Sequence, residues 1–262
     1  MNALIVTCDD CGLSEGVNSA TLDLHRRGIA SGASVMTNFP AAAHALDLFR
    51  ACPGLSVGVH LNLTDGIPLT SIPAGTNLTG HDGRFRPIAH LARQALFPSA
   101  RTLSSIEEEL TAQFEVLARA GFAPQHVTTH LQFHVVPSLR RIVLRLAHAY
   151  RVAWVRPHSV RATVVPWNPL LSRKLGSTGP KTRGAAAPDY MAVLRSWQGR
   201  GPDALIRTLA GLSGTVELVV HPDIDDDPTF PAYIAYGPHG RFAETKFLER
   251  CWPLLRQGGD AR

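Results

Sequence analysis

Six polar side chains that can bind a metal ion or transfer a proton stand at or near the ends of short apolar runs in this 262-residue sequence. One carboxylate and two imidazoles are a common ligand set for a divalent ion that leaves positions open for water and substrate. Asp10, His60 and His130 make up such a set, so the pattern indicates metal-assisted hydrolysis. The six residues are Asp9, Asp10, His60, His130, Arg156 and His221.

The residues outside the ligand set fit roles in proton transfer. Asp9 is adjacent to the expected ligand Asp10, so its carboxylate can accept a proton from a metal-activated water. His221 is the candidate that protonates the leaving group. Arg156 either keeps Asp9 ionised, because a nearby cation lowers a carboxyl pKa, or forms an ion pair that is only structural. Hydrolysis of an unreactive amide requires such a base, Lewis acid and general acid.

Two further groups of residues are candidates for supporting parts of this site. His134 follows His130 by four residues, and we expect it to contact the substrate or a site residue, or else to be structural. An acidic cluster follows His221, and one of its members is a candidate to orient the His221 ring, although such a cluster is also typical of a solvated turn. The cluster consists of Asp223, Asp225, Asp226 and Asp227.

Apolar runs with the length of strands alternate with helical patterns along the chain, which predicts an α/β fold with mainly parallel strands. A Gly-rich nucleotide fingerprint is absent after the first run, which disfavours an open dinucleotide-binding sheet. Polar residues at the C-terminal ends of several strands instead predict a (β/α) barrel. The expected strands are Ala3–Cys8, Ala33–Met36, Leu55–Leu61, His126–Leu131, Val152–Arg156 and Thr215–Val220. The expected helices are Ser14–Arg27, Pro40–Ala51, Leu103–Ala120, Pro137–Tyr150, a mostly helical Asp189–Ser213, and Arg241–Arg256.

Composition excludes several classes of protein. The hydrophobic content of 45% suits one globular domain over residues 1–262, with excursions at about 64–88 and 157–188. No apolar stretch is long enough for a membrane span, and the N-terminal run meets Asp9 and Asp10 too soon for a signal peptide, so we expect a cytoplasmic protein. The Cys8–Cys11 spacing encloses two carboxylates and has no second cysteine pair, which argues against a redox motif or a zinc knuckle.

Basic residues are concentrated in one part of the chain. Eleven Arg and Lys residues and no acid fall between Val116 and Pro188. The segment is either a solvated basic face or a positive rim that attracts an anionic substrate. Aromatic residues do not interleave with these basic residues, so we expect no nucleic-acid partner.

The chain resembles the YdjC-type carbohydrate deacetylases, which include chito-oligosaccharide deacetylase and hopanoid-associated relatives. The resemblance extends over most of the chain and depends on several motifs in combination. These are Val6–Ser14; Gly58–Thr64 followed by Gly66, Pro68 and Leu69; His126–His130 followed by His134 and Pro137; Arg156; and His221–Pro222.

The resemblance implies a distorted (β/α) barrel that removes the acetyl group from an N-acetylated sugar with the help of one divalent metal ion. It places the metal on Asp10, His60 and His130, with Asp9 as base and His221 as acid. Family members are usually assigned Mg²⁺, but two imidazoles and one carboxylate suit Zn²⁺ better, so the ion is Mg²⁺ or Zn²⁺. The resemblance also implies a homodimer.

A sugar substrate adds candidates for contacts with the ligand. Asn62, in the second motif, is a candidate substrate contact. Four aromatic residues can stack on a sugar ring, although burial in the core is the more frequent fate of such residues. They are Trp167, Tyr190, Trp197 and Tyr236.

Three positions depart from the family pattern. The third motif usually reads Asp-Ser-His-x-His-x-His, whereas Thr128 and Gln132 here replace an acid and a histidine. Cys11 stands where an aromatic residue is usual. We interpret these changes, with the basic segment, as signs of an unusual substrate, such as an anionic sugar or a glycosylated secondary metabolite. The alternatives are a metallohydrolase of another bond, such as a phosphoester, and a sugar-binding protein of this fold without turnover.

Overall fold

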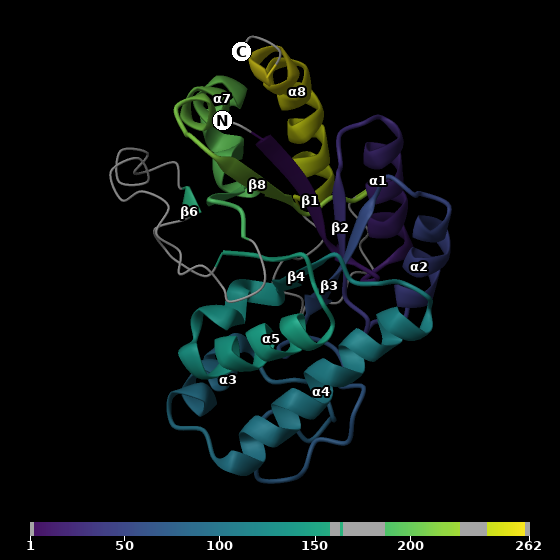
Figure 1. Ribbon diagram of the computed structural model, residues 1–262, viewed down its shortest axis with the longest axis vertical. Coiled ribbons are helices and arrows are strands. Elements are labelled where there is room, and N and C mark those ends of the chain that lie inside the picture. Colours follow the sequence, from purple (N-terminus) through teal and green to yellow (C-terminus); the bar gives the residue numbers. More distant parts are fainter. Residues whose placement is uncertain (1–2, 158–162, 165–186, 226–239, 260–262) are drawn as a thin grey trace.

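The computed structural model describes residues 3–157, 163–164, 187–225 and 240–259, and its centre is a single curved sheet (Figure 1). The strand order is β5-β4-β3-β2-β1-β8-β7-β6, and every described pairing is parallel. Parallel pairing brings the C-terminal ends of the strands to one edge of the sheet. The strands are β1 (Ala3–Cys11), β2 (Gly32–Val35), β3 (Ser56–Leu61), β4 (His126–Thr129), β5 (Trp154–Val155), β6 (Thr163–Val164), β7 (Tyr190–Val193) and β8 (Thr215–Val220).

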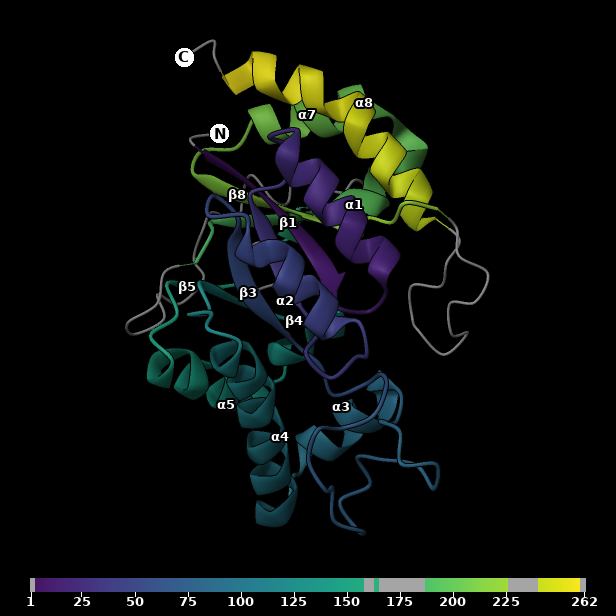
Figure 2. The same ribbon diagram turned by 90° about the vertical axis from the view of Figure 1, so that its right-hand side faces the viewer.

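Helices surround the outside of this sheet. Figures 1 and 2 show α7 and α8 on one side of the molecule, α4 and α5 on the opposite side, and α1 and α2 beside β1 and β2. Within the described ranges, no helix is both long and apolar enough to cross a bilayer. The helices are α1 (Glu15–Arg26), α2 (Ala42–Arg50), α3 (Ile88–Leu96), α4 (Ala100–Arg119), α5 (Pro137–Ala149), α7 (Pro202–Ala210) and α8 (Arg241–Gly259), with 3₁₀ segments η1 (His130–Val135) and η3 (Leu194–Arg200).

The architecture confirms the expected distorted (β/α) barrel. The sheet curls, and its end strands β5 and β6 are not paired with each other among the described residues. The predicted strand Thr215–Val220 is β8 with the same bounds, and Ser14 caps α1 by accepting a hydrogen bond from the Val17 amide at 3.1 Å. The predicted helix Leu103–Ala120 is α4 and begins three residues earlier than expected, at Ala100, because Ser99 is its N-cap.

The prediction of a mostly helical segment at Asp189–Ser213 is wrong for its first part. Tyr190–Val193 is strand β7, which pairs with β8 through Tyr190 and Val216. A short apolar run can be stabilised as a strand or a helix, and here pairing with a buried neighbour decides in favour of the strand. Helix α3 was not predicted.

The two expected excursions have different outcomes. Between β3 and α3 the structure describes no helix or strand, and Thr79 and Phe85 form one isolated antiparallel bridge. The excursion at about 157–188 lies mostly outside the described residues.

An irregularity at the end of β1 changes the direction of its side chains. The register of β1 against β2 shifts between Cys8 and Cys11, and Asp10 has a φ of 64°, in the left-handed region. A non-glycine residue in this region costs about 1–3 kcal/mol and is characteristic of functional sites. In a regular strand Asp9 and Asp10 would point to opposite faces. The irregularity allows both carboxylates to reach His60, at 3.8 Å and 3.2 Å.

The sheet beneath the site contains a buried histidine that is structural. The Nε2 and Nδ1 atoms of His126 each lie 3.1 Å from a serine hydroxyl, of Ser34 and Ser56, and its ring stacks on Trp154 at 4.7 Å. Burial, assisted by the charge of Arg156, lowers the pKa of His126 to about 3, so the ring is neutral. Gly58 of β3 lies directly against this ring and against the His126 carbonyl oxygen.

We expect Gly58→Ala to destabilise the fold, because a Cβ at this position would overlap the His126 ring and backbone. The loss of unfolding free energy should be about 1–3 kcal/mol, as for other overpacked interiors. Denaturant titration measures it. Gly199→Ala is the matched control, since a Cβ there meets nothing within 4 Å and should change stability far less. Equal stability of the two variants would contradict the packing argument.

Candidate functional site

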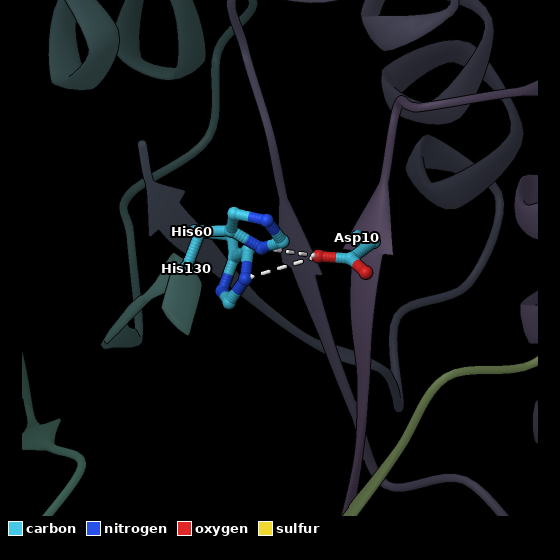
Figure 3. A group of neighbouring side chains, drawn as sticks. All are labelled: Asp10, His60 and His130. Atoms are coloured by element: carbon cyan, nitrogen blue, oxygen red, sulfur yellow. Dashed lines mark hydrogen bonds and ion pairs between the residues drawn. The ribbon is translucent and has the colours of Figure 1, made fainter. Parts of the chain in front are cut away.

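Three of the predicted residues meet at the C-terminal edge of the sheet (Figure 3). Asp10 Oδ1 lies 3.2 Å from His60 Nε2 and 3.1 Å from His130 Nδ1. One ligand atom from each residue lies within 4.8 Å of the others, and all three side chains are buried. Ligand atoms bound at about 2.0–2.2 Å to one metal lie about 3.0–3.4 Å apart. The spacing therefore fits a shared divalent ion.

Asp10 is the centre of this group and also contacts the last helix. Arg241, the first residue of α8, donates a hydrogen bond of 2.6 Å to Asp10 Oδ2. Burial alone would raise the pKa of Asp10, but His130 and Arg241 lower it well below its usual value. The carboxylate is therefore ionised, and Oδ1 faces the two imidazoles.

Thr128 positions the His60 ring from the neighbouring strand. His60 Nδ1 lies 2.7 Å from Thr128 Oγ1, whose hydroxyl is 3.5 Å from the Val59 carbonyl oxygen. With Thr128 accepting a hydrogen bond from Nδ1, the Nε2 lone pair of His60 is directed at the ligand group. A hydroxyl thus orients this ring at the position where the family motif usually has an acid.

His130 is held between two carboxylates. Its Nδ1 faces Asp10, and its Nε2 lies 2.8 Å from Asp65 Oδ2. Burial would lower the pKa of His130, but Asp10 and then Asp65 raise it to about 9. A metal-binding histidine commonly donates its other N–H to a carboxylate, which fixes the ring and increases its basicity. Asp65 is placed to accept that hydrogen bond.

Asp9 forms a bidentate ion pair with Arg156. The two guanidinium nitrogens lie 2.6 Å and 2.9 Å from the Asp9 oxygens, and Arg156 also contacts Glu217 at 2.7 Å. Burial opposes ionisation of Asp9, but Arg156 and His60 lower its pKa to about 2. Asp9 is therefore a carboxylate over the whole physiological pH range.

His221 follows β8 and is oriented by a residue of the last helix. Glu244 Oε1 accepts a hydrogen bond from the His221 backbone amide at 3.1 Å and lies 3.5 Å from its Nδ1. Glu244 is fully buried in α8. Glu244 is thus a carboxylate that the structure places beside this ring. Of the acids that follow His221, Asp226 and Asp227 lie outside the described residues.

Four of these site residues line one cavity, here named the site cavity. Its volume is about 360 Å³, and its polar lining includes Asp9, His60, Arg156 and His221. Leu131 and Gln132 form part of the wall, with φ of 50° and 53°. Two consecutive non-glycine residues in the left-handed region cost free energy, which the surrounding packing must supply.

The buried charges around this cavity are predominantly negative. The predicted site residues and their described partners include at least five buried carboxylates and two buried guanidinium groups. Burying excess negative charge is unfavourable, so the site favours added positive charge from a protonated imidazole or a divalent ion. The donor set and its charge both fit a metal ion. The carboxylates are those of Asp9, Asp10, Asp65, Glu217 and Glu244, and the guanidinium groups are those of Arg156 and Arg241.

The remaining predicted residues have other positions. His134 is buried, and its Nδ1 contacts Thr129 Oγ1, so it supports a residue of the cavity wall. Asn62 is fully buried, and its side chain bonds Thr64, Asp65 and Asn38, so it holds a loop and is not placed as a substrate contact. Tyr190 and Trp197 are buried in the core, which excludes stacking on a ligand. Trp167 and Tyr236 lie outside the described residues.

Sequence reasoning missed the buried partners of the site residues. Glu217 had a visible signal, because a lone acid inside the apolar strand β8 requires a buried cation. Asp65, Arg241 and Glu244 had none, since charged residues in turns and first helical turns are common. Cys8 and Cys11 are buried thiols, and burial raises the pKa of Cys11 to about 12.

Comparison with known proteins gives consistent matches. The family model described as YdjC-like protein matches residues 3–250. A carbohydrate deacetylase from Geobacillus stearothermophilus is 37% identical over 159 residues, and the match spans 59% of this chain and 61% of that protein. A carbohydrate deacetylase from Halalkalibacterium halodurans is 30% identical over 255 residues, or 94% of this chain and 95% of that protein.

One solved structure shares the fold over almost the whole chain. It is a proposed cellobiose-phosphate cleavage protein from Enterococcus faecalis V583, with a TM-score of 0.75. The match covers 99% of this chain and 96% of that chain at 21% sequence identity. At this identity the likeness concerns the fold alone.

We expect the purified protein to bind about one equivalent of Zn²⁺ per chain and His60→Ala to weaken that binding more than about 100-fold. Loss of a ligand should exceed the 10–100-fold effect typical of changes behind a ligand. Metal content after dialysis and competition with a chelator measure both quantities. His148→Ala is the control, because His148 is exposed on α5. Equal Zn²⁺ affinity of the two variants would show that the cluster is not the binding site.

Proposed function

Since the chain belongs to the YdjC-like protein family, we propose that it is a metal-dependent hydrolase that removes the N-acetyl group from an amino sugar and releases acetate. The observation that carries this proposal is that a candidate base, a candidate acid and a candidate metal ligand line one cavity. An ionised carboxylate, Asp9, and an imidazole, His221, line the same space as the ligand His60. The carbohydrate deacetylases similar to this chain support the choice of bond.

Asp10, His60 and His130 would hold the metal ion. A divalent ion bound there supplies Lewis acidity toward the acetyl carbonyl and the attacking water. Two imidazoles and one carboxylate favour Zn²⁺, because Mg²⁺ prefers oxygen ligands and retains several waters. The identity of the ion is thus part of the proposal.

Asp9 is the proposed general base. It accepts a proton from the water that attacks the acetyl carbon, and Arg156 holds both of its oxygens in place. The bidentate pair lowers the pKa of Asp9, so the carboxylate is always available but is a weak base. Asp9 can therefore act as the base only if the site also lowers the pKa of the attacking water.

His221 is the proposed general acid. As the C–N bond of the acetamide breaks, the leaving nitrogen needs a proton, and the His221 ring lines the cavity where that nitrogen would lie. Glu244, which lies 3.5 Å from Nδ1 and accepts a hydrogen bond from the His221 backbone amide, orients the ring. Amide hydrolysis requires this protonation because an amide anion is a very poor leaving group.

An anionic substrate would have to be bound by arginines of the basic segment. Arg119, Arg145 and Arg156 of the basic segment each pair with a carboxylate from elsewhere in the chain. Five other basic residues of that segment lie outside the described ranges. We therefore propose an N-acetylated amino sugar or its glycoconjugate without assigning a negative charge to it.

We expect Asp9→Asn to lower the rate of acetate release from N-acetylated sugars about 10²–10⁴-fold while Zn²⁺ binding is retained, because the amide cannot accept the proton. An enzyme-coupled acetate assay and metal analysis on the same samples measure both effects. Asp47→Asn is the matched control, since Asp47 is an exposed surface residue. Full activity in Asp9→Asn would overturn the assignment of the base, and phosphate release from phosphorylated sugars without acetate release from N-acetylated sugars would favour a phosphoesterase.

Glu244→Gln should slow amide hydrolysis about 10-fold or more, because the His221 ring loses the carboxylate that orients it as the proton donor. The variant should hydrolyse p-nitrophenyl acetate at the wild-type rate, since that leaving group needs no proton. The ratio of the two rates is the measurement, and a fold defect would lower both. Glu249→Gln, on the same helix but at the surface, is the control. A proportional loss on both substrates would make Glu244 merely structural.

A further inference from the structure

Helix α4 has two large polar side chains on its buried side. Glu109 and Gln113 are fully buried and lie one helical turn apart, beside apolar residues such as Leu110 and Phe114. A buried carboxylate or amide is unfavourable unless hydrogen bonds replace those that it loses with water. The groups that these two side chains contact therefore indicate why they are buried.

Glu109 holds the loop that follows β3. Its two carboxylate oxygens accept hydrogen bonds from the backbone amides of Leu69 and Thr70 at 3.1 Å and 2.9 Å. The Thr70 hydroxyl donates at 2.7 Å, and the side-chain amide of Gln113 donates at 2.8 Å. All of these donors are neutral, so the buried carboxylate is stabilised by hydrogen bonds that fix the backbone of the loop.

Gln113 holds the start of the same loop. Its side-chain oxygen accepts a hydrogen bond from the Asn62 backbone amide at 2.9 Å, and its Nε2 donates to the Asn62 carbonyl at 2.7 Å. The Asn62 side chain in turn accepts hydrogen bonds from the amides of Thr64 and Asp65 at 3.0 Å and 3.2 Å. The loop is therefore attached to α4 at both of its ends, through Asn62 and through Thr70.

Asp65 lies between these two attachment points and faces the proposed metal group. Its Oδ2 lies 2.8 Å from His130 Nε2, while His130 Nδ1 faces Asp10 (Figure 3). A hydrogen bond weakens steeply when its distance and angle change. Whether Asp65 can accept the His130 N–H thus depends on where the loop lies, and α4 fixes the loop on both sides of Asp65.

From these contacts we propose that Glu109 is a positioning residue for the metal group, which acts by holding Asp65 in place beside His130. An oriented and more basic His130 binds a divalent ion more tightly. Glu109 does not line the site cavity, so it acts only through the loop. The proposal rests on the proposed function, because it concerns the metal ion of that site.

The Zn²⁺ affinity of the full chain, measured by competition with a chelator, tests this role without an activity assay. Asp65→Ala should weaken Zn²⁺ binding about 10–100-fold, the usual effect of removing the partner of a ligand. Glu109→Gln leaves one acceptor oxygen and places an NH₂ group against the donors of the loop. It should weaken Zn²⁺ binding about three- to ten-fold, because Asn38 still donates to the Asp65 carbonyl.

The double variant Asp65→Ala/Glu109→Gln shows whether Glu109 acts through Asp65. Once Asp65 is absent, we expect Glu109→Gln to change the Zn²⁺ affinity by less than about two-fold, because the group that it positions is gone. A long-range effect of the Glu109 charge, or a general loosening of the fold, would lower the affinity by the same factor in both backgrounds. That outcome, or an unchanged affinity in the single variant Glu109→Gln, would overturn the proposal.

Glu108→Gln is the matched control, since Glu108 is the preceding residue of α4 and is exposed, with Ser104 as its hydrogen-bond partner. It removes the same charge and should leave the Zn²⁺ affinity at the wild-type value. Thr70→Val is a milder second variant, because it removes the hydroxyl donor and keeps the Glu109 carboxylate. It should weaken Zn²⁺ binding a few-fold, and only when Asp65 is present. Thermal unfolding of the metal-free proteins verifies that each variant is folded.

The same binding measurements separate this proposal from the proposed function. If the wild type binds Zn²⁺ and His60→Ala does not, while Glu109→Gln and Thr70→Val bind it like the wild type, the role of Glu109 is refuted and the metal site stands. If the wild type binds no Zn²⁺, the metal assignment in the proposed function is refuted and the role of Glu109 with it.

Discussion

The buried carboxylate of Asp10 is the constraint on which the rest of the site depends. A buried ion is tolerated only when charged and hydrogen-bonding partners surround it. Here the partners are His60 of β3, His130 at the start of η1 and Arg241 in the first turn of α8. The carboxylate thus ties β1 to β3, to η1 and to the last helix, and the left-handed backbone of Asp10 itself is part of the same arrangement.

Asp9, the acid next to Asp10, is likewise held by buried charged partners. Asp9 shares Arg156 with Glu217, so one guanidinium balances part of the charge of two buried carboxylates. The consequence is chemical as well as structural, because the pair fixes both oxygens of Asp9 and keeps them ionised. Asp9 and Asp10 are adjacent in one strand but thereby have separate environments. This difference suits the two roles that we propose for them, Asp10 as metal ligand and Asp9 as base.

The departure at Thr128 places a neutral hydroxyl, and not a carboxylate, beside His60 Nδ1 on the neighbouring strand. His60 is oriented by the neutral Thr128 hydroxyl, whereas His130 faces the carboxylate of Asp65 from a different loop. Both rings are oriented, and the carboxylates of Asp10 and Asp65 raise the pKa of His130. The resemblance to the YdjC family, confirmed by the family model, is therefore compatible with the altered third motif.

The sequence by itself determined the α/β class, most strands and the polar residues at their ends, because hydrophobic periodicity and short motifs are local properties. It also determined that Asp10, His60 and His130 would meet, since parallel strands share one edge. Only the tertiary structure decided that Tyr190–Val193 is a strand, that Asn62 holds a loop, and that Glu244 orients His221. These outcomes depend on partners distant in the chain, and the free energy of burying and pairing a charge is set by that three-dimensional neighbourhood, which no local pattern encodes.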